Sequence, residues 1–324
     1  MKRTAILLLV IGCLILSACG SATGNGNSAP TKKISLALIV GTISDPFYTS
    51  MSCGARAEAN RLGATLNVQG AANWGISDQT PIINAVSTTH PDAMIVVPVD
   101  SKAMIPPIKT AAGAGIKIIL ADTSLDDTSF VSSSVSSANI QLGAAAADTL
   151  ANLINQQGAV LVLGLDPGAS TVVDRNKGFM QELQQKYPNI TYLGAPLTTN
   201  TTNGDVQQMV AELAHHPNLS GVFSLDDSSA EAAGTAIRQV HKEGSIKVVG
   251  FDTSPTEIDM LRKGIVQALI GQKPYEIGVQ AVDQAVMAAE GKATTKFIGT
   301  GAVSVTLQNL NDPGVSQFLY KTQC

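Results

Sequence analysis

Short apolar runs alternate with longer amphipathic stretches along this chain, and that alternation limits the possible folds more than any other feature. We predict strands at nine of the apolar runs: residues 34–40, 64–68, 93–97, 116–121, 159–163, 190–193, 222–225, 246–251 and 266–270. Amphipathic stretches such as 48–62 and 207–215 are typical of helices. Continuous apolar strands separated by helices indicate parallel sheets that are covered on both faces, so we expect a doubly wound α/β protein.

Length and an internal repeat both predict two lobes. About 290 residues follow position 34, which is more than one hydrophobic core usually holds. A His-Pro pair precedes an apolar strand that leads to an aspartate, first from His90 to Asp100 and again from His216 to Asp226, at the same offset of 126 residues (216 minus 90). Two similar lobes explain this spacing, although His-Pro is only a dipeptide and an aspartate after a strand is a common helix N-cap.

The N-terminus has the pattern of an export signal. Lys2 and Arg3 precede a twelve-residue apolar run that ends in Leu-Ser-Ala-Cys at Cys19, and this resembles a bacterial lipoprotein signal. In such signals the cysteine is acylated and the peptide is cut just before it. We therefore expect a signal peptide at 1–18, lipid on Cys19, a flexible tether at 19–33 and an extracytoplasmic, membrane-anchored protein. The alternative, a spanning anchor, needs ~20 apolar residues.

Composition narrows the class of protein. There are 21 basic and 25 acidic residues, which gives a net charge of -4, and no basic run predicts binding to nucleic acid. The four histidines lack the spacing of a metal site, and neither a Walker loop nor a Gly-x-Ser-x-Gly elbow occurs. We therefore expect no metal, no cofactor and no enzymatic activity. Once Cys13 is removed with the signal and Cys19 carries lipid, Cys53 and Cys324 remain as one possible disulfide.

Polar and aromatic residues follow several of the predicted strands. Ligands of open parallel sheets bind beyond the carboxyl ends of the strands, and the residues at those ends are Asp45, Phe47, Tyr48, Trp74, Asp122-Thr123, Asp226-Asp227, Asp252-Thr253 and Gln272. Aspartates accept hydrogen bonds from neighbouring sugar hydroxyls, while aromatic faces pack on the C–H surface of the ring. The pattern thus predicts a site for a sugar or polyol. Trp74 is either a stacking surface in this site or a core residue.

Five motifs occur in one order along the chain: 45–48 (Asp-Pro-Phe-Tyr), 118–122 (Ile-Ile-Leu-Ala-Asp), 174–179 (Asp-Arg-Asn-Lys-Gly-Phe), 248–252 (Val-Val-Gly-Phe-Asp) and 272–278 (Gln-Lys-Pro-Tyr-Glu-Ile-Gly). Over nearly the whole mature length the chain resembles the type 1 periplasmic sugar-binding proteins, closest to the ribose-binding group. The resemblance implies two Rossmann-like lobes joined by a hinge. We expect an N-terminal lobe at 34–137 plus 273–301, a C-terminal lobe at 138–272 plus 302–310 and a tail at 311–324.

The resemblance also implies roles for individual residues. Phe47 and Tyr48 would sandwich the sugar, and Asp122 and Asp252 would bind its hydroxyls. The rest of the expected ligand-binding set consists of Asp45, Trp74, Thr123, Arg175, Asp226 and Gln272.

Two departures from the ribose-binding pattern bear on the ligand. Thr123 stands where those proteins have an arginine, and Asp45 and Asp226 stand where they have asparagines. Ribose is therefore not expected, and the site would hold four carboxylates against the one guanidinium of Arg175. Because buried like charges are costly, either the ligand is hydroxyl-rich with an amino group, or some aspartates face elsewhere as caps and turns. Asp45, which precedes a proline, fits the second reading best.

The resemblance implies a monomeric solute-binding lipoprotein that delivers a sugar or polyol to the permease and ATPase of an ABC importer. A sensory receptor for a membrane kinase or chemoreceptor is the alternative within the same fold, and a sugar-modifying hydrolase is the alternative from another class. One cysteine in the first helix and one at the end of the chain resemble the paired cysteines of an actinobacterial-like branch of the family. On that resemblance we predict a disulfide between Cys53 and Cys324.

Overall fold

The computed structural model describes residues 33–199 and 201–324. The predicted signal peptide, the lipidation site Cys19 and the tether up to residue 32 lie outside the described residues. Within the described ranges, no helix has both the length and the apolar character needed to cross a bilayer.

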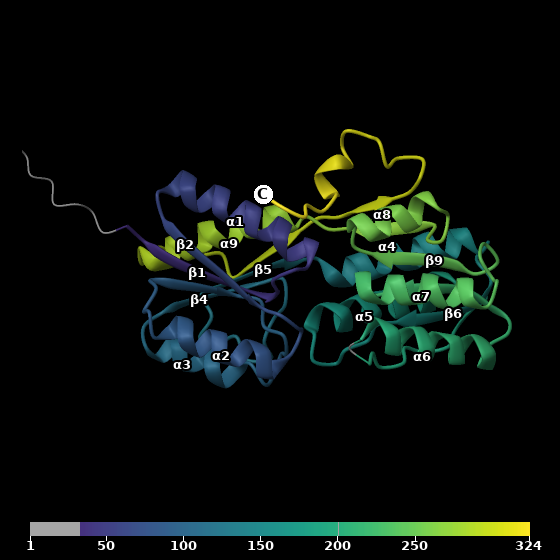
Figure 1. The fold of residues 1–324 in the computed structure, drawn as a ribbon, viewed down its shortest axis with the longest axis horizontal. Helices are drawn as coiled ribbons and strands as arrows, with labels where there is room; N and C mark the ends of the chain where they lie inside the picture. The colour runs from purple at the N-terminus through teal and green to yellow at the C-terminus, as the bar shows by residue number, and fades with distance from the viewer. Residues whose placement is uncertain (1–32, 200) are drawn as a thin grey trace, which may run out of the picture. The chain divides into compact units, whose positions relative to one another are not determined.

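Two six-stranded sheets form the framework of the molecule (Figure 1). Sheet A has the order β11-β5-β4-β3-β1-β2, and sheet B has the order β12-β10-β9-β8-β6-β7. The strands of sheet A are β1 Ser35–Thr42, β2 Thr65–Ala71, β3 Ala93–Val96, β4 Lys117–Ala121, β5 Ser133–Ser137 and β11 Phe297–Thr300. Those of sheet B are β6 Gly158–Leu163, β7 Ile190–Tyr192, β8 Leu219–Ser224, β9 Lys247–Phe251, β10 Ala268–Gly271 and β12 Val303–Val305.

The predicted α/β class and the internal repeat are both confirmed. All nine predicted apolar runs form strands, and β3 and β8, the strands of the two His-Pro repeats, occupy the same place in their sheets. Pairing is parallel throughout except between β10 and β12, which run antiparallel. Three strands were not predicted, namely β5, β11 and β12.

Helices cover both faces of each sheet, as a doubly wound fold requires. Their bounds are α1 Pro46–Leu62, α2 Ile76–Ser87, α3 Ile105–Gly113, α4 Asn139–Leu153, α5 Ser170–Lys186, α6 Thr202–His215, α7 Asp227–Gln239, α8 Pro255–Arg262 and α9 Pro274–Ala289. Apolar residues of α1 and α9 pack on one face of sheet A, and those of α2 and α3 pack on the other. On sheet B, α4 and α5 cover one face and α6, α7 and α8 the other. We call each sheet with its helices lobe A and lobe B.

Helices α1 and α9 cross at glycines. A Cβ atom on Gly54 would lie 2.0 Å from the carbonyl oxygen of Tyr275, and one on Gly278 would lie 2.0 Å from the carbonyl oxygen of Met51. Each helix therefore needs glycine where the other backbone passes. In Figure 1, α9 lies beside α1 although it is late in the chain.

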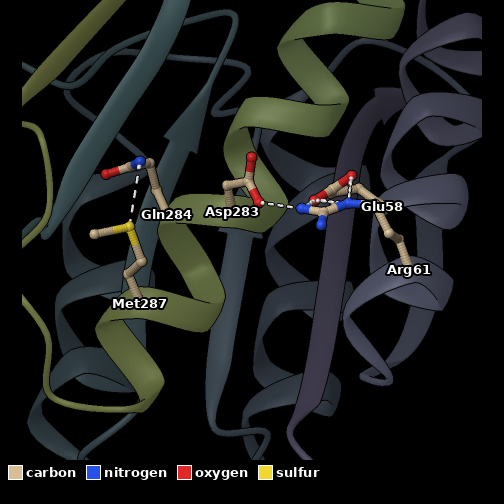
Figure 2. Close-up of polar contacts among 5 residues, drawn as sticks. All are labelled: Glu58, Arg61, Asp283, Gln284 and Met287. Atoms are coloured by element: carbon tan, nitrogen blue, oxygen red, sulfur yellow. Dashed lines mark hydrogen bonds and ion pairs between the residues drawn. The ribbon is translucent and has the colours of Figure 1, made fainter.

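An ion-pair group also joins these two helices (Figure 2). Arg61 of α1 pairs with Glu58 one turn earlier and reaches Asp283 of α9, with 3.4 Å between Nη2 and Oδ1. The Arg61 side chain is 64% exposed. Since exposed ion pairs contribute about 0–1 kcal/mol, the glycine contacts are the stronger reason for the close crossing.

Lobe B repeats the glycine crossing with α5 and α4. A Cβ on Gly178 would lie 1.9 Å from the carbonyl oxygen of Ile140, and one on Gly143 would lie 2.0 Å from that of Arg175. Gly54 and Gly178 thus occupy matching places, as do Met51 and Arg175. The two lobes are built from the same helix pair packed on the same sheet.

The chain passes between the sheets after β5, after β10 and after β11. Hydrogen bonds join the three passages: Ser137 Oγ donates to Gln272 Oε1 at 2.6 Å, and the Ala138 N–H donates to the Thr300 carbonyl at 3.2 Å. The expected lobe boundaries were drawn at these segments, and they stay a prediction.

The C-terminal tail lies across both lobes. The carbonyl of its buried Phe318 accepts a hydrogen bond from the hydroxyl of Thr253, a residue that follows β9 in lobe B. Further along, the Lys321 N–H donates to Ser50 Oγ of α1 at 2.7 Å, and Cys324 is bonded to Cys53 of the same helix. The predicted disulfide is confirmed, and Figure 1 shows the chain end beside α1.

Candidate functional site

A cavity of about 250 Å³ lies at the carboxyl ends of the strands, with lining residues from both lobes. Nine of the ten predicted ligand-binding residues line it: Asp45, Phe47, Tyr48, Trp74, Asp122, Arg175, Asp226, Asp252 and Gln272. The lining also includes Thr42, Asp166, Ala169, Thr171, Val172, Thr198, Asp227 and Ser228. The fold therefore brings together residues that lie more than two hundred positions apart in the chain.

Thr123 is the predicted residue that the structure does not bring to this cavity. Its hydroxyl donates to the carbonyl of Pro98 at 2.7 Å, and its side chain is 2% exposed. Because Asp122 has a left-handed backbone conformation, the next residue turns away from the cavity into the loop that follows β3.

The first turn of α1 places the aromatic wall. Asp45 is the N-cap, and its Oδ1 accepts from the Phe47 N–H at 2.7 Å, while Pro46 fits the first helical position. This local geometry fixes Phe47 and Tyr48 in the first turn of α1. Asp45 is thus a cap, as one of the two alternatives had it, and it lines the cavity as well.

The three aromatic rings of lobe A that line the cavity contact one another, and the rings of Phe47 and Tyr48 are not parallel. Those two rings meet edge to face at 88°, whereas Tyr48 and Trp74 are stacked with centroids 6.4 Å apart. Trp74 packs directly over Gly41, where a Cβ would lie 2.3 Å from its ring. Trp74 is therefore packed against the core and also faces the cavity.

Asp122 and Asp252 occupy equivalent positions directly after β4 and β9. Both have positive φ values, 61° and 91°, which only a few per cent of non-glycine residues adopt, aspartate more often than most. Each N–H bonds to the neighbouring strand, from Asp122 to Val135 at 2.8 Å and from Asp252 to Ile270 at 2.9 Å. The same backbone turn thus presents one carboxylate from each lobe to the cavity.

Each of these carboxylates accepts a hydrogen bond from a tyrosine. Tyr48 donates to Asp122 Oδ2 at 3.0 Å, and Tyr320 donates to Asp252 Oδ1 at 2.6 Å. Gln272 Nε2 also donates to Asp252 Oδ1, at 2.6 Å. The tail residue Tyr320 was missed at the level of sequence, because nothing near position 320 indicates that it contacts the residue after β9.

Arg175 is held rigidly in the cavity wall. Its Nε donates to Asn139 Oδ1 at 3.0 Å, its Nη1 donates to the Leu225 carbonyl at 2.6 Å, and its guanidinium lies 3.7 Å above the Phe251 ring. The residue is 4% exposed. These contacts fix a single buried cation near the aspartates.

Burial dominates the electrostatics of the cavity. Loss of water, together with the charges of Asp252, Asp122 and Asp226, raises the pKa of Asp45 to about 7, against the lowering effect of the Phe47 N–H. Burial also raises the pKa of Asp122 to about 6, against the opposing effects of Arg175 and the Tyr48 hydroxyl. The pKa of Asp227 is raised well above its usual value, first by burial and then by Asp45 across the cavity.

In the part of the chain that the structure describes, no group of three or more His, Cys, Asp or Glu side chains is arranged to hold a metal ion.

Comparison with known proteins identifies the family. The model of the periplasmic binding protein domain matches residues 36–293, which is most of the chain. The chain belongs to the periplasmic binding protein family. It is 28% identical to the ribose import binding protein of Bacillus subtilis, over 92% of this chain and 97% of that protein.

Solved structures of this family show the same fold. An ABC transporter solute-binding protein from Agrobacterium vitis, bound with α-D-tagatopyranose, is 35% identical with a TM-score of 0.86 and covers 89% of this chain and 100% of its own. A carbohydrate transporter solute-binding protein from Agrobacterium radiobacter, in complex with D-arabinose, is 25% identical with a TM-score of 0.84 and covers 89% and 99%. The expected resemblance to type 1 periplasmic sugar-binding proteins is confirmed.

Proposed function

We propose that this chain binds a sugar or sugar-like ligand in the cavity between its lobes and delivers it to an ABC importer. The observation that supports this most is the convergence of three aromatic rings, one buried arginine and carboxylates of both sheets on one cavity. Rings suit the C–H faces of a sugar, and carboxylates suit its hydroxyls. The family's solved members, with tagatose and arabinose bound, support the same class of ligand.

Binding is coupled to hinge closure in this proposal. The ligand contacts Asp122 on lobe A and Asp252 on lobe B, so only the closed arrangement completes its hydrogen bonds. The segments around Ser137, Gln272 and Thr300, which pass between the sheets, are the proposed hinge. The permease would then recognise the closed receptor together with its bound ligand.

The setting of this receptor is also part of the proposal. The signal-like N-terminus supports cleavage before Cys19 and lipid attachment there, so the monomeric receptor would stay at the outer face of a membrane beside its permease and ATPase. Cys19→Ser should release the protein from the membrane fraction. A variant that stays membrane-bound would contradict the anchor without touching the ligand site.

A thermal-shift screen of monosaccharides, polyols and amino sugars tests the ligand class. A ligand at 100 times its Kd should add about 2.7 kcal/mol of stability. Asp252→Asn should lose most of this shift, while Asp259→Asn, on the exposed face of α8, should keep it. The sugar should be recovered chemically unchanged after incubation. A screen without any stabilising compound, or a converted sugar, would overturn the proposal.

A further inference from the structure

The cavity is strongly unbalanced in charge. Six aspartates and one arginine are among its lining residues. The arginine, Arg175, already donates to Asn139 and to the Leu225 carbonyl, so part of its hydrogen-bonding capacity serves the fold. A neutral sugar would leave this imbalance uncorrected.

The carboxylates face one another across the two lobes. Asp45 and Asp122 come from lobe A, and Asp226, Asp227 and Asp252 come from lobe B. Closing the lobes on a neutral ligand therefore brings like charges together in a space largely removed from water, where repulsion is strong. A positive charge placed between them turns the same closure into an attraction.

Asp122 provides an independent sign that a donor is missing. It is 5% exposed and lines the cavity, and among the described residues its Oδ1 is a buried oxygen without a hydrogen-bond partner. Its Oδ2 is occupied by the Tyr48 hydroxyl. A buried acceptor left unpaired destabilises the fold, so a ligand donor at this place would recover that cost.

The groups that surround Asp45 are consistent with this picture. The charged and titratable groups that interact with it are Asp252, Asp122, Asp226, Asp227 and the Tyr48 phenol, and none of them is basic. Burial and these neighbours raise the pKa of Asp45 to about 7. The site thus either takes up a proton when it closes or receives a cation with its ligand.

We infer that the ligand of this cavity is a hydroxyl-rich molecule with a protonated amino group, such as an amino sugar or an amino polyol. The inference rests on the proposed function and names the ligand class within it. The ammonium would lie between carboxylates of the two lobes, and the ring hydroxyls would use the remaining oxygens. The cavity, of about 250 Å³, would hold both parts in one small molecule.

Matched sugar pairs test the inference directly. D-glucose, D-galactose and D-mannose are each compared with derivatives that carry an amino group at carbon 2, 3, 4 or 6, by calorimetry between pH 5 and pH 7. At least one amino sugar should bind tenfold or more tightly than its parent, about the gain from one charge-assisted hydrogen bond. Its affinity should rise with pH over this interval as the carboxylates ionise. A neutral sugar should show the opposite trend, because closure on it favours protonated aspartates.

Charge-removing variants separate the ammonium contact from general effects. Asp45→Asn keeps the helix cap, since asparagine caps as well as aspartate, and Asp227→Asn removes the charge that faces it. At least one of the two should weaken amino-sugar binding about tenfold or more, while parent-sugar binding should stay the same or become tighter because a repelling charge is removed. Asp259→Asn is the matched control on the surface.

Three results would overturn the inference. Parent sugars that bind as tightly as every amino counterpart would contradict it and leave the sugar-binding proposal intact. Stabilisation by Ca²⁺ or Mg²⁺ alone would assign the excess charge to a metal. Absence of binding by both sets would overturn the inference, whereas the proposed function would fail only if the wider thermal-shift screen also found no stabilising compound.

Discussion

After β1, lobe A places two aromatic rings in the first turn of α1, whereas after β6 lobe B places Thr171, Val172 and then Arg175 along α5. The backbones at these places match, down to the glycines at which each helix crosses its partner. The side chains differ: lobe A provides ring faces and lobe B provides a fixed cation and most of the carboxylates. The two similar lobes thus present different side chains, and so different contacts, at the same edge of their sheets.

The supports of Asp122 and Asp252 differ in a similar way. Asp252 accepts two hydrogen bonds on one oxygen, one of them from the tail, while Asp122 accepts one from Tyr48 and keeps an unpaired oxygen. Equal backbone positions therefore do not mean equal readiness for a ligand. Lobe B holds Asp252 in place before a ligand binds, whereas in lobe A one oxygen of Asp122 remains to accept a hydrogen bond from the ligand.

The largest effect is expected from removing the disulfide, which links the tail covalently to lobe A and has no counterpart in lobe B. The disulfide closes a segment of 271 residues between Cys53 and Cys324, and the position on α5 that matches Cys53 is Lys177. Cys53→Ser with Cys324→Ser should lower the free energy of unfolding by about 3–5 kcal/mol, since long loops gain most from closure. Chemical denaturation followed by Trp74 fluorescence measures this in lobe A. A change below about 1 kcal/mol would show that the noncovalent contacts of the tail suffice.

The glycine crossings test whether the two lobes are equivalent as scaffolds. Gly54→Ala and Gly178→Ala should each cost about 3 kcal/mol, at the upper end of overpacking effects, because the new Cβ meets backbone rather than a movable side chain. Gly113→Ala, at an open position of α3, should be neutral or stabilising by up to about 1 kcal/mol. Thermal unfolding of the three variants measures this. Costs that differ between the lobes by more than about 1 kcal/mol would contradict the equivalence.

Removing the Tyr48 hydroxyl sharpens the contrast between the aspartates. Tyr48→Phe leaves Asp122 without its tyrosine donor and should cost about 1.5–3 kcal/mol at pH 7, the range for hydrogen bonds to charged groups. The pKa of Asp122, already raised to about 6 by burial, should rise further. A carboxyl group whose pKa is raised in the folded protein lowers stability as the pH rises from its pKa in the unfolded chain to its pKa in the folded protein. The stability loss caused by Tyr48→Phe should therefore be smaller at pH 4 than at pH 7. Carboxyl NMR titration and unfolding at several pH values measure both effects, and a loss that is the same at pH 4 and pH 7 would count against this role.

Tyr320→Phe should have the smallest effect. Asp252 keeps its bond from Gln272, so we expect a loss of about 1 kcal/mol in stability and a several-fold weaker affinity for a ligand found in the screen. Combining it with Asp252→Asn distinguishes positioning from mere packing. If the effect of Tyr320→Phe on affinity persists unchanged in the Asp252→Asn background, Tyr320 does not act through Asp252.

Much of the framework was predictable because its strands are apolar and continuous. Strand β5 was not, since Ser-Ser-Val-Ser-Ser lacks the residues that usually indicate a buried strand, although Ser133 and Ser137 are buried there. Strands β11 (Phe-Ile-Gly-Thr) and β12 (Val-Ser-Val) are interrupted by glycine or serine, so neither forms a continuous apolar run. Their places depend on neighbours far away in the chain.

The candidate site was predictable where a residue directly follows a strand, as Asp122 and Asp252 do. Thr123 shows the limit of that rule, since a left-handed turn at one residue sends the next one elsewhere. Tyr320 shows another limit. Its contact with Asp252 bridges 68 positions and depends on how the tail is attached, which no local pattern encodes.

The covalent ring closed by Cys53 and Cys324 has a consequence for damage outside the cell. A protease attacks exposed loop tips first, and almost every loop of both lobes lies between the two cysteines. A single cut in this interval opens the ring but leaves one covalently connected molecule. We expect the nicked receptor to keep both lobes together and to separate into two pieces only after reduction.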